Sequence, residues 1–236
     1  RPIYNLALPG TGVRSSHDYL LHVLTERQQA APDRPLRTVL LGLDLMDYLV
    51  EAQAPAVQGG EGSTDPAAAR LHGASSPALG GRTLRQLRDY AQSTLTMGAL
   101  FDALQTLAAQ RDPYAADLDA QGFNPMRDYI KIAADEGYWR LFRQKDLANS
   151  RSFARRPTAL IHADGREGAP LRELRKIIAL CRERGIDLRL VIYPYHAHLL
   201  EIIAATGHWP AFEEWKRQLV RLVDEEGRGT VALWDF

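Results

Sequence analysis

Apolar and polar residues alternate along this chain with two periods, one typical of strands and one typical of helices. Four short, mostly apolar runs predict strands: residues 3–8, 37–43, 188–192 and 231–234. Between them, apolar residues recur every three or four positions, as along residues 171–181 and 212–222, which predicts helices with one apolar face. The order strand, helix, strand, then helix, strand, helix, strand is that of a parallel sheet with right-handed crossovers.

The expected fold class is therefore α/β, with a flavodoxin-like parallel sheet. The run at residues 37–43 is nearly continuous in apolar residues, and a strand of this kind is usually buried on both sides. We therefore expect helices on both faces of the sheet. The helix along residues 171–181 should end at Gly185, a good C-cap residue, and residues 188–192 should form the central strand.

The middle of the chain has a different composition. Residues 52–82 are rich in Ala, Gly, Pro and Ser and nearly free of large apolar side chains. We expect a mobile loop there, because little apolar surface is available to offset the entropy cost of ordering. Residues 83–147 carry apolar side chains at helical spacing, which predicts a helical insert on the sheet. No internal repeat is apparent, and residues 1–236 are expected to form one domain.

Composition and charge narrow the classes of function. The chain has 236 residues, of which 45% are hydrophobic and 25% charged, as in ordinary globular proteins. Lys and Arg together number 29, and so do Asp and Glu, so no net charge favours nucleic acid. No apolar run approaches the ~20 residues of a membrane span, and no signal peptide opens the chain. Both ends nevertheless look cut from a longer chain, so we expect an incomplete domain. The cellular compartment is therefore not assigned from the missing signal peptide.

Cysteine and glycine patterns exclude further classes of site. The single cysteine, Cys181, lies on an apolar helix stripe, which predicts a buried thiol and excludes an internal disulfide. The motif Gly10-x-Gly12 lacks the third glycine of a dinucleotide fingerprint, and no P-loop is present. No cofactor is therefore expected.

Polar residues whose side chains are suited to catalysis or binding follow the predicted strands. Parallel strands align their carboxyl ends, and α/β proteins place their ligands at that edge. This brings Gly10, Asp44 with Asp47, the segment 193–198 and Asp235 toward one edge of the sheet. Each alone would equally suit a turn or a cap, so their coincidence carries the hypothesis. The candidate catalytic residues are His196, Asp44 and Asp235.

The segment 193–198 is dense in aromatic and imidazole groups. Tyr193, Tyr195 and His198 are the candidate substrate contacts in it. His196 and His198 with a carboxylate would also suit zinc. On a helix, however, residues two apart point about 200° away from each other, so no metal is assigned.

Three segments of the chain resemble a known family in sequence and order: residues 4–10 (YNLALPG), 39–44 (VLLGLD) and 191–201 (VIYPYHAHLLE). The family is that of SGNH/GDSL-type hydrolase-like proteins, related to bacterial proteins that O-acetylate alginate and other cell-surface polysaccharides. The resemblance implies that Asn5 and Gly10 contact substrate, since the matching block carries a glycine that helps to bind the oxyanion. Asp44 stands where the family usually has an oxyanion-stabilising Asn, and a carboxyl group donates a hydrogen bond only when protonated.

Two catalytic blocks of SGNH hydrolases have no counterpart in this sequence. It contains no Gly-Asp-Ser and no Asp-x-x-His at its carboxyl end, so nucleophile and base are not identified, and Ser15 and Ser16 are expected to cap a helix. In the family, a serine-bearing strand separates the strands that match residues 3–8 and 39–43. We therefore expect those two strands not to pair directly. Either another segment fills the place between them or, as we favour, the sequence omits part of the parent chain.

Two functions remain open at this stage. The resemblance implies a domain linked to ester hydrolysis or O-acetyl transfer on cell-surface carbohydrate, as a carbohydrate esterase or O-acetyltransferase of the bacterial periplasm or cell envelope. The alternative is a non-catalytic domain that binds polysaccharide or an envelope protein partner through the same edge and its Tyr and Trp side chains. The expected ligand is carbohydrate or an acylated small molecule.

Overall fold

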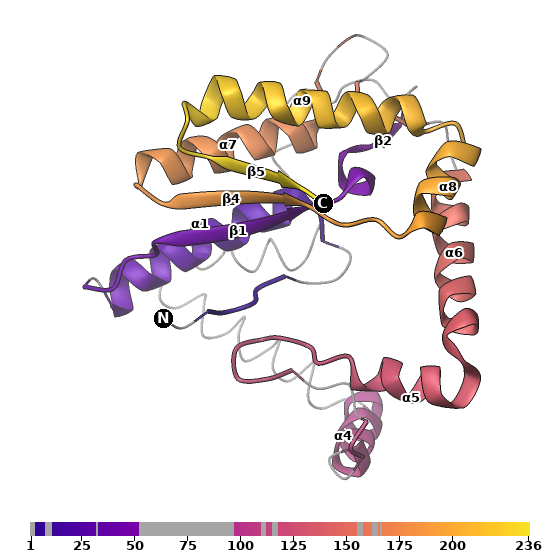
Figure 1. Cartoon of the computed structure of the whole chain (residues 1–236). Coiled ribbons are helices and arrows are strands. Elements are labelled where there is room, and N and C mark those ends of the chain that lie inside the picture. Colours follow the sequence, from indigo (N-terminus) through magenta and orange to yellow (C-terminus); the bar gives the residue numbers. More distant parts are fainter. Residues whose placement is uncertain are drawn as a thin grey trace. The chain divides into compact units, whose positions relative to one another are not determined.

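The computed structural model describes residues 3–7, 11–31, 33–51, 97–109, 112–114, 118–154, 158–161, 165 and 167–236. These residues form an α/β fold around a three-stranded parallel sheet, which confirms the predicted fold class (Figure 1). The strands, in sheet order, are β1 (Thr38–Leu43), β4 (Asp187–Ile192) and β5 (Ala232–Asp235). The strand predicted to be central, β4, does lie between the other two.

One face of the sheet is covered by helices. They are α1 (Val13–Ala30), α7 (Ala169–Glu183) and α9 (Trp209–Gly227). Helix α7 packs against β4 and α1, and α9 packs against α7 and β5; Figure 1 shows these helices running alongside the strands. The apolar stripes predicted for α7 and α9 fill the core with the inward residues of the strands, among them Leu43, Leu190, Ile192, Ile178 and Trp215.

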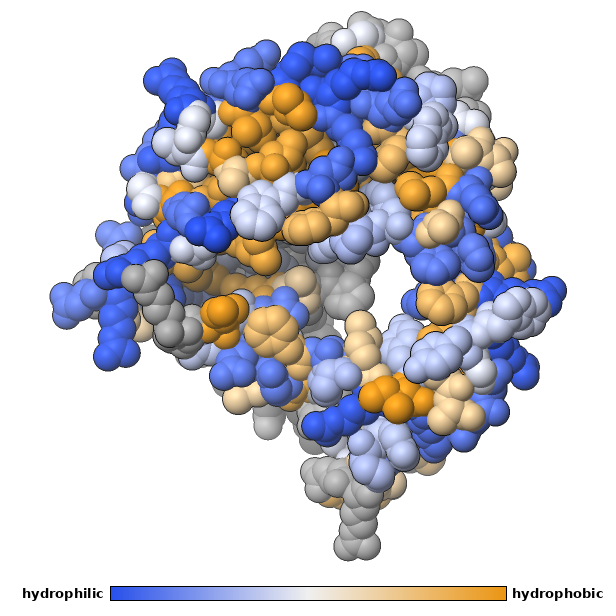
Figure 2. Space-filling view, viewed as in Figure 1, coloured by the Kyte–Doolittle hydropathy of each residue, from blue (hydrophilic) through white to orange (hydrophobic). Residues whose placement is uncertain are grey.

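The opposite face of the sheet, the open face, carries exposed strand side chains in the described residues, and the helices expected to cover it stay a prediction. Along β4, Leu190 is buried while its neighbour Arg189 is exposed. On the same side as Arg189, Leu40 of β1 is 70% exposed and Trp234 of β5 is 48% exposed. Figure 2 shows apolar atoms at the surface in the area where Figure 1 draws β5 and α9. The apolar run of β1 thus includes Leu40 on the open face as well as the inward residue Leu43.

The predicted first strand is wrong for residues 3–7, and Leu8 lies outside the described residues. Residues 3–7 are irregular. The Asn5 backbone N–H donates to the carbonyl of Gln121 at 2.7 Å, and its side-chain amide donates to that of Gly122 at 3.1 Å. Gly122 has φ +81°, and a Cβ there would collide with the Asn5 carbonyl oxygen, so this turn requires glycine.

The outer edge of β1 pairs with no strand among the described residues. Residues 3–7 are irregular and form no ladder with it. The backbone N–H and C=O groups of an edge strand remain available for pairing. That another segment pairs with this edge of β1 stays a prediction.

Contacts divide the chain into two compact units, Arg1–Leu6 with His72–Arg143, and Ala7–Leu71 with Gln144–Phe236. The helical insert predicted for residues 83–147 includes α4 (Met97–Ala109), α5 (Arg127–Glu136) and the start of α6 (Tyr138–Ala154). Gly137, with φ +83°, separates α5 from α6. The predicted mobile loop at residues 52–82 and the first part of the insert lie outside the described residues. The single domain stays a prediction.

Several local predictions can be compared with the structure. Gly185, with φ +63°, follows the end of α7 as predicted. Helix α1 begins at Val13 with Gly12 as N-cap, so Ser15 and Ser16 lie inside its first turn and do not cap it. Cys181 is buried as predicted, and burial raises the pKa of its thiol to about 11. No helix in the described ranges has the length and apolar character needed to cross a membrane.

Candidate functional site at the carboxyl edge of the sheet

The three parallel strands end at one edge of the sheet. Leu43, Ile192 and Asp235 occupy the same register row. Asp44 therefore follows β1, Asp235 closes β5 and His196 follows β4 at this edge. The predicted gathering of Asp44, His196 and Asp235 at one edge is confirmed, whereas their chemical roles stay predictions.

A hydrogen-bond cluster joins the ends of β1 and β4. The Tyr195 hydroxyl accepts from the backbone N–H of Leu45 at 2.7 Å and donates to Oδ1 of Asp44 at 3.0 Å. Oδ1 also accepts from the N–H of Met46 at 3.0 Å, because Asp44 is the N-cap of the 3-10 helix η1 (Leu45–Tyr48). Burial and the charge of Asp44 raise the pKa of Tyr195. The phenol therefore keeps its proton, and Asp44 serves as an acceptor.

Asp47, within η1, adds a second carboxyl group beside this cluster. Burial and the charge of Asp44 raise the pKa of Asp47 to about 6. The start of α1 lies close to it, since a Cβ at Gly12 would be 3.9 Å from Oδ1 of Asp47. A carboxyl group with a pKa near 6 exchanges its proton readily near neutral pH. The strand pattern placed Asp47 with Asp44 at this edge, whereas the burial that raises its pKa comes from the tertiary structure.

Tyr193, the first residue after β4, folds back over β1. Its backbone N–H donates to the carbonyl of Leu43 at 3.3 Å. Its ring lies over Gly42, where any Cβ would collide with the phenol. Burial, followed by the charges of Asp44 and Asp47, raises the pKa of the Tyr193 hydroxyl. The side chain is nevertheless 46% exposed, so one side of the ring is accessible to a ligand.

Tyr193 shares the open face of the sheet with a second aromatic residue. Gly42, Val191 and Trp234 occupy one register row across the three strands. Side chains in such a row point to the same face, which here is the open one. Neighbouring strands lie ~4.8 Å apart, so the aromatic surfaces over Gly42 and at Trp234 are separated by about two strand spacings. They can contact one extended ligand.

The two histidines lie at the start of α8 (Ala197–Ala205). His196 is the N-cap, and its Nδ1 accepts from the backbone N–H of His198 at 3.3 Å. The two rings meet edge to face with their centroids 4.7 Å apart. Nδ1 of His198 lies 3.0 Å from Oδ2 of Asp146 in α6. Asp146 could not be predicted from the sequence, because the two partners are 52 positions apart and no local pattern links them.

Asp235 is held at the edge by an ion pair. The Lys216 ammonium group donates to both carboxylate oxygens of Asp235, at 2.7 and 3.0 Å. It also lies 4.6 Å from the centroid of the Phe212 ring. Phe212 in turn packs against the Tyr195 ring, with centroids 5.5 Å apart. Asp235 is thus connected to Tyr195 through successive contacts with Lys216 and Phe212.

The residues implied by the resemblance are Asn5 and Gly10. Asn5 belongs to the unit that contains Gln121 and Gly122 and bonds to them. Gly10 lies outside the described residues. Their predicted contacts with substrate stay predictions. In the described part of the chain, no group of three or more His, Cys, Asp or Glu side chains is arranged to hold a metal ion.

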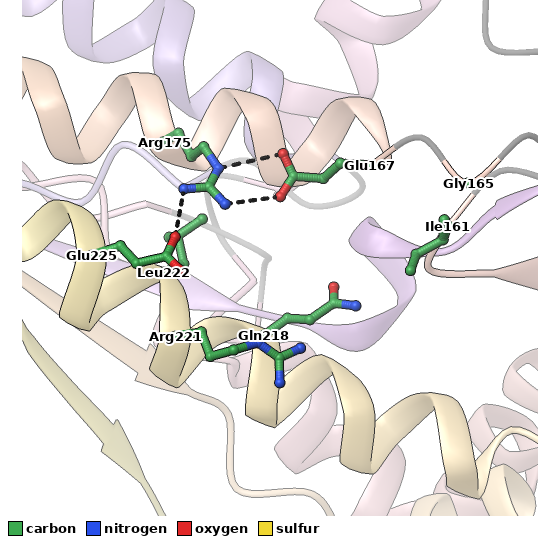
Figure 3. A pocket seen from close by; sticks show the side chains of 8 residues that line it. All are labelled: Ile161, Gly165, Glu167, Arg175, Gln218, Arg221, Leu222 and Glu225. Carbon is green, nitrogen blue, oxygen red and sulfur yellow. Dashed lines mark hydrogen bonds and ion pairs between the residues drawn. The ribbon is translucent and has the colours of Figure 1, made fainter.

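A pocket of about 210 Å³ lies between α7, α9 and the segment 161–167 (Figure 3). In Figure 3, Arg175 points between Glu167 and Glu225, and it also pairs with Glu226 at 3.1 Å. Three carboxylates therefore neutralise this guanidinium group. The pocket contains none of the predicted site residues, and its ion pairs hold α7 to α9.

Comparison with protein-family models, curated proteins and solved structures found no match for this chain. A functional assignment therefore depends on the chemistry of the site itself.

Proposed function

We propose that this domain acts on acylated cell-surface carbohydrate, in ester hydrolysis or O-acetyl transfer, as the SGNH-type resemblance implies. The observation that carries the proposal is that carboxylate, phenol and imidazole groups all follow strand ends at the carboxyl edge of the parallel sheet. They come from Asp44, Tyr195 and His198. Open α/β sheets bind ligands at this edge. Placement in the periplasm or cell envelope is part of the same proposal.

The exposed aromatic groups support a carbohydrate ligand. Tyr193 and Trp234 present ring surface on the open face of the sheet, and the C–H groups of a sugar pack well on such rings. Aromatic side chains also bind with little loss of conformational entropy. The carboxylate of Asp44 and the imidazole of His196, which follow β1 and β4 at the same edge, would supply hydrogen-bond partners for sugar hydroxyls.

The experiment compares an acetylated polysaccharide, such as acetylated polymannuronate, with the same polymer after chemical deacetylation. Calorimetry measures binding, and an acetate assay measures ester cleavage. We expect binding together with release of acetate, and Tyr193→Ala should weaken binding at least about tenfold, the size of a stacking contact. Tyr114→Ala is the matched control, because Tyr114 is also an exposed tyrosine but lies in the other unit. The proposal would be contradicted if the protein neither bound any acylated polysaccharide nor released acetate from it.

The second candidate function is non-catalytic binding of polysaccharide. It is favoured by the exposure of Tyr193 and Trp234, which supports stacking whether or not an ester is cleaved. Binding that depends on Tyr193, without release of acetate from any acetylated polymer, would select this alternative.

A further inference from the structure

We propose that His198 is the general base of this site and that Asp146 positions it. The inference rests on the proposed function, since it names the group that activates the attacking hydroxyl in ester cleavage. His198 was expected from the sequence only as a substrate contact. Its pairing with Asp146 in α6 suggests a more specific role.

The hydrogen bond to Asp146 determines which imidazole nitrogen is basic. Oδ2 of Asp146 lies 3.0 Å from Nδ1 of His198, and an ionised carboxylate can only accept. Nδ1 therefore carries the proton of the neutral ring, and Nε2 presents its lone pair. The His198 side chain is 49% exposed, so water and substrate can reach it. No hydrogen bond recorded for the described residues occupies Nε2.

The ring of His198 is held on a second side by His196. The backbone N–H of His198 donates to Nδ1 of His196 at 3.3 Å, and the two rings meet at 86°. The backbone of position 198 is also fixed in the first turn of α8. A base held in one orientation loses less entropy when it meets its substrate.

Stability alone does not account for this pair. Exposed ion pairs add little to the free energy of folding, because solvent screens them. The chain contains a contrasting pair, His17 with Glu173 at 2.9 Å, in which both side chains are at most 15% exposed. That pair links α1 to α7, and Glu173 also binds Lys176 at 2.8 Å. The His17 pair is therefore the more buried of the two, whereas the exposed His198 pair, which links α6 to α8, contributes less to stability.

The proposed step uses water and the carbohydrate ester as its only reactants. Nε2 of His198 takes a proton from water while the water oxygen bonds to the acyl carbon. The ester C–O bond then breaks, the departing sugar oxygen takes the proton from Nε2, and a carboxylic acid and a sugar hydroxyl result. Asp146 stays ionised and stabilises the transient imidazolium. A sugar hydroxyl in place of water gives acyl transfer by the same proton path.

The test combines kinetics of acetate release with the NMR tautomer state of His198 at pH 8, on the full chain. His198→Asn should lower kcat/KM by roughly 10²–10⁴-fold, the usual contribution of a general base. Asp146→Asn should lower kcat at least about tenfold with KM nearly unchanged, and shift His198 toward the Nε2–H tautomer. Glu173→Gln, which breaks the other His–carboxylate pair, should change neither. Circular dichroism verifies that each variant folds.

The outcomes separate this inference from the function on which it rests. Normal activity in His198→Asn would overturn the base assignment and leave the proposed function standing. A wild-type His198 found in the Nε2–H tautomer would overturn positioning by Asp146. Failure of the wild-type chain to release acetate would overturn the proposed function and the base role with it, while the tautomer measurement would still report whether Asp146 holds His198.

Discussion

The phenol ring of Tyr193 lies directly over Gly42, so close that no side chain fits at position 42. Glycine in the middle of a strand normally weakens it, and this contact explains why it occurs in β1. The first residue after β4 is thereby held against its neighbouring strand. The position of the Tyr193 ring at the candidate site thus requires that residue 42 has no side chain.

Gly42→Ala should displace Tyr193 and destabilise the protein. Forcing a methyl group into an occupied space costs about 1–3 kcal/mol, and carbohydrate binding should weaken with it. Urea unfolding and calorimetry measure the two effects. In a Tyr193→Ala background the space is vacant, so the cost of Gly42→Ala should disappear. An equal cost in both backgrounds would show that the contact with Tyr193 is not the cause.

Tyr195→Phe should destabilise the junction between β1 and β4. The change removes the acceptor for the Leu45 N–H and the donor to Asp44, and the loss of such bonds costs about 1–3 kcal/mol. Tyr48→Phe is the matched control, because the buried Tyr48 hydroxyl has no hydrogen-bond partner in the structure described. Its removal should be neutral or stabilising. Urea denaturation measures the free energy of unfolding of both variants. Similar losses of stability in the two would contradict the role assigned to the Tyr195 hydroxyl.

Asp47 should make stability depend on pH. Its pKa of about 6 in the folded protein exceeds the value of ~3.9 for an unperturbed aspartate. Between these values the folded state binds more protons than the unfolded state, so stability falls as pH rises from about 4 to 6. Asp47→Asn should therefore raise the free energy of unfolding above pH 7 by about 1–2 kcal/mol, allowing for solvent screening. Near pH 4 it should change little, and unfolding curves with equal shifts at both pH values would contradict this.

The two faces of the sheet should respond differently to truncation. Leu190→Ala, on the covered face, should cost about 2–5 kcal/mol because it leaves a cavity. Leu40→Ala, on the open face, should cost less than about 1 kcal/mol, since Leu40 is already 70% exposed. Denaturant unfolding measures both, and a comparable loss for Leu40→Ala would mean that this face is covered.

Local sequence patterns were enough to predict the positions of β1, β4 and β5 and of helices α7 and α9. They also predicted that Asp44, His196 and Asp235 meet at one edge. Each of these follows from local information: strands and helices repeat with different periods, and parallel strands align their carboxyl ends. The predicted apolar stripes of α7 and α9 are buried because a helix in water must cover its apolar face.

Contacts between side chains that are far apart in the sequence came only from the packing of the elements. Asn5 bonds to the turn at Gln121 and Gly122, and no strand forms there. Asp146 and His198 pair across 52 positions. The exposure of Leu40 on one side of β1 could not be predicted from the sequence, because apolar residues lie on both sides of that strand. Contacts of this kind depend on the packing of elements far apart in the chain, and local periodicity carries no information about them.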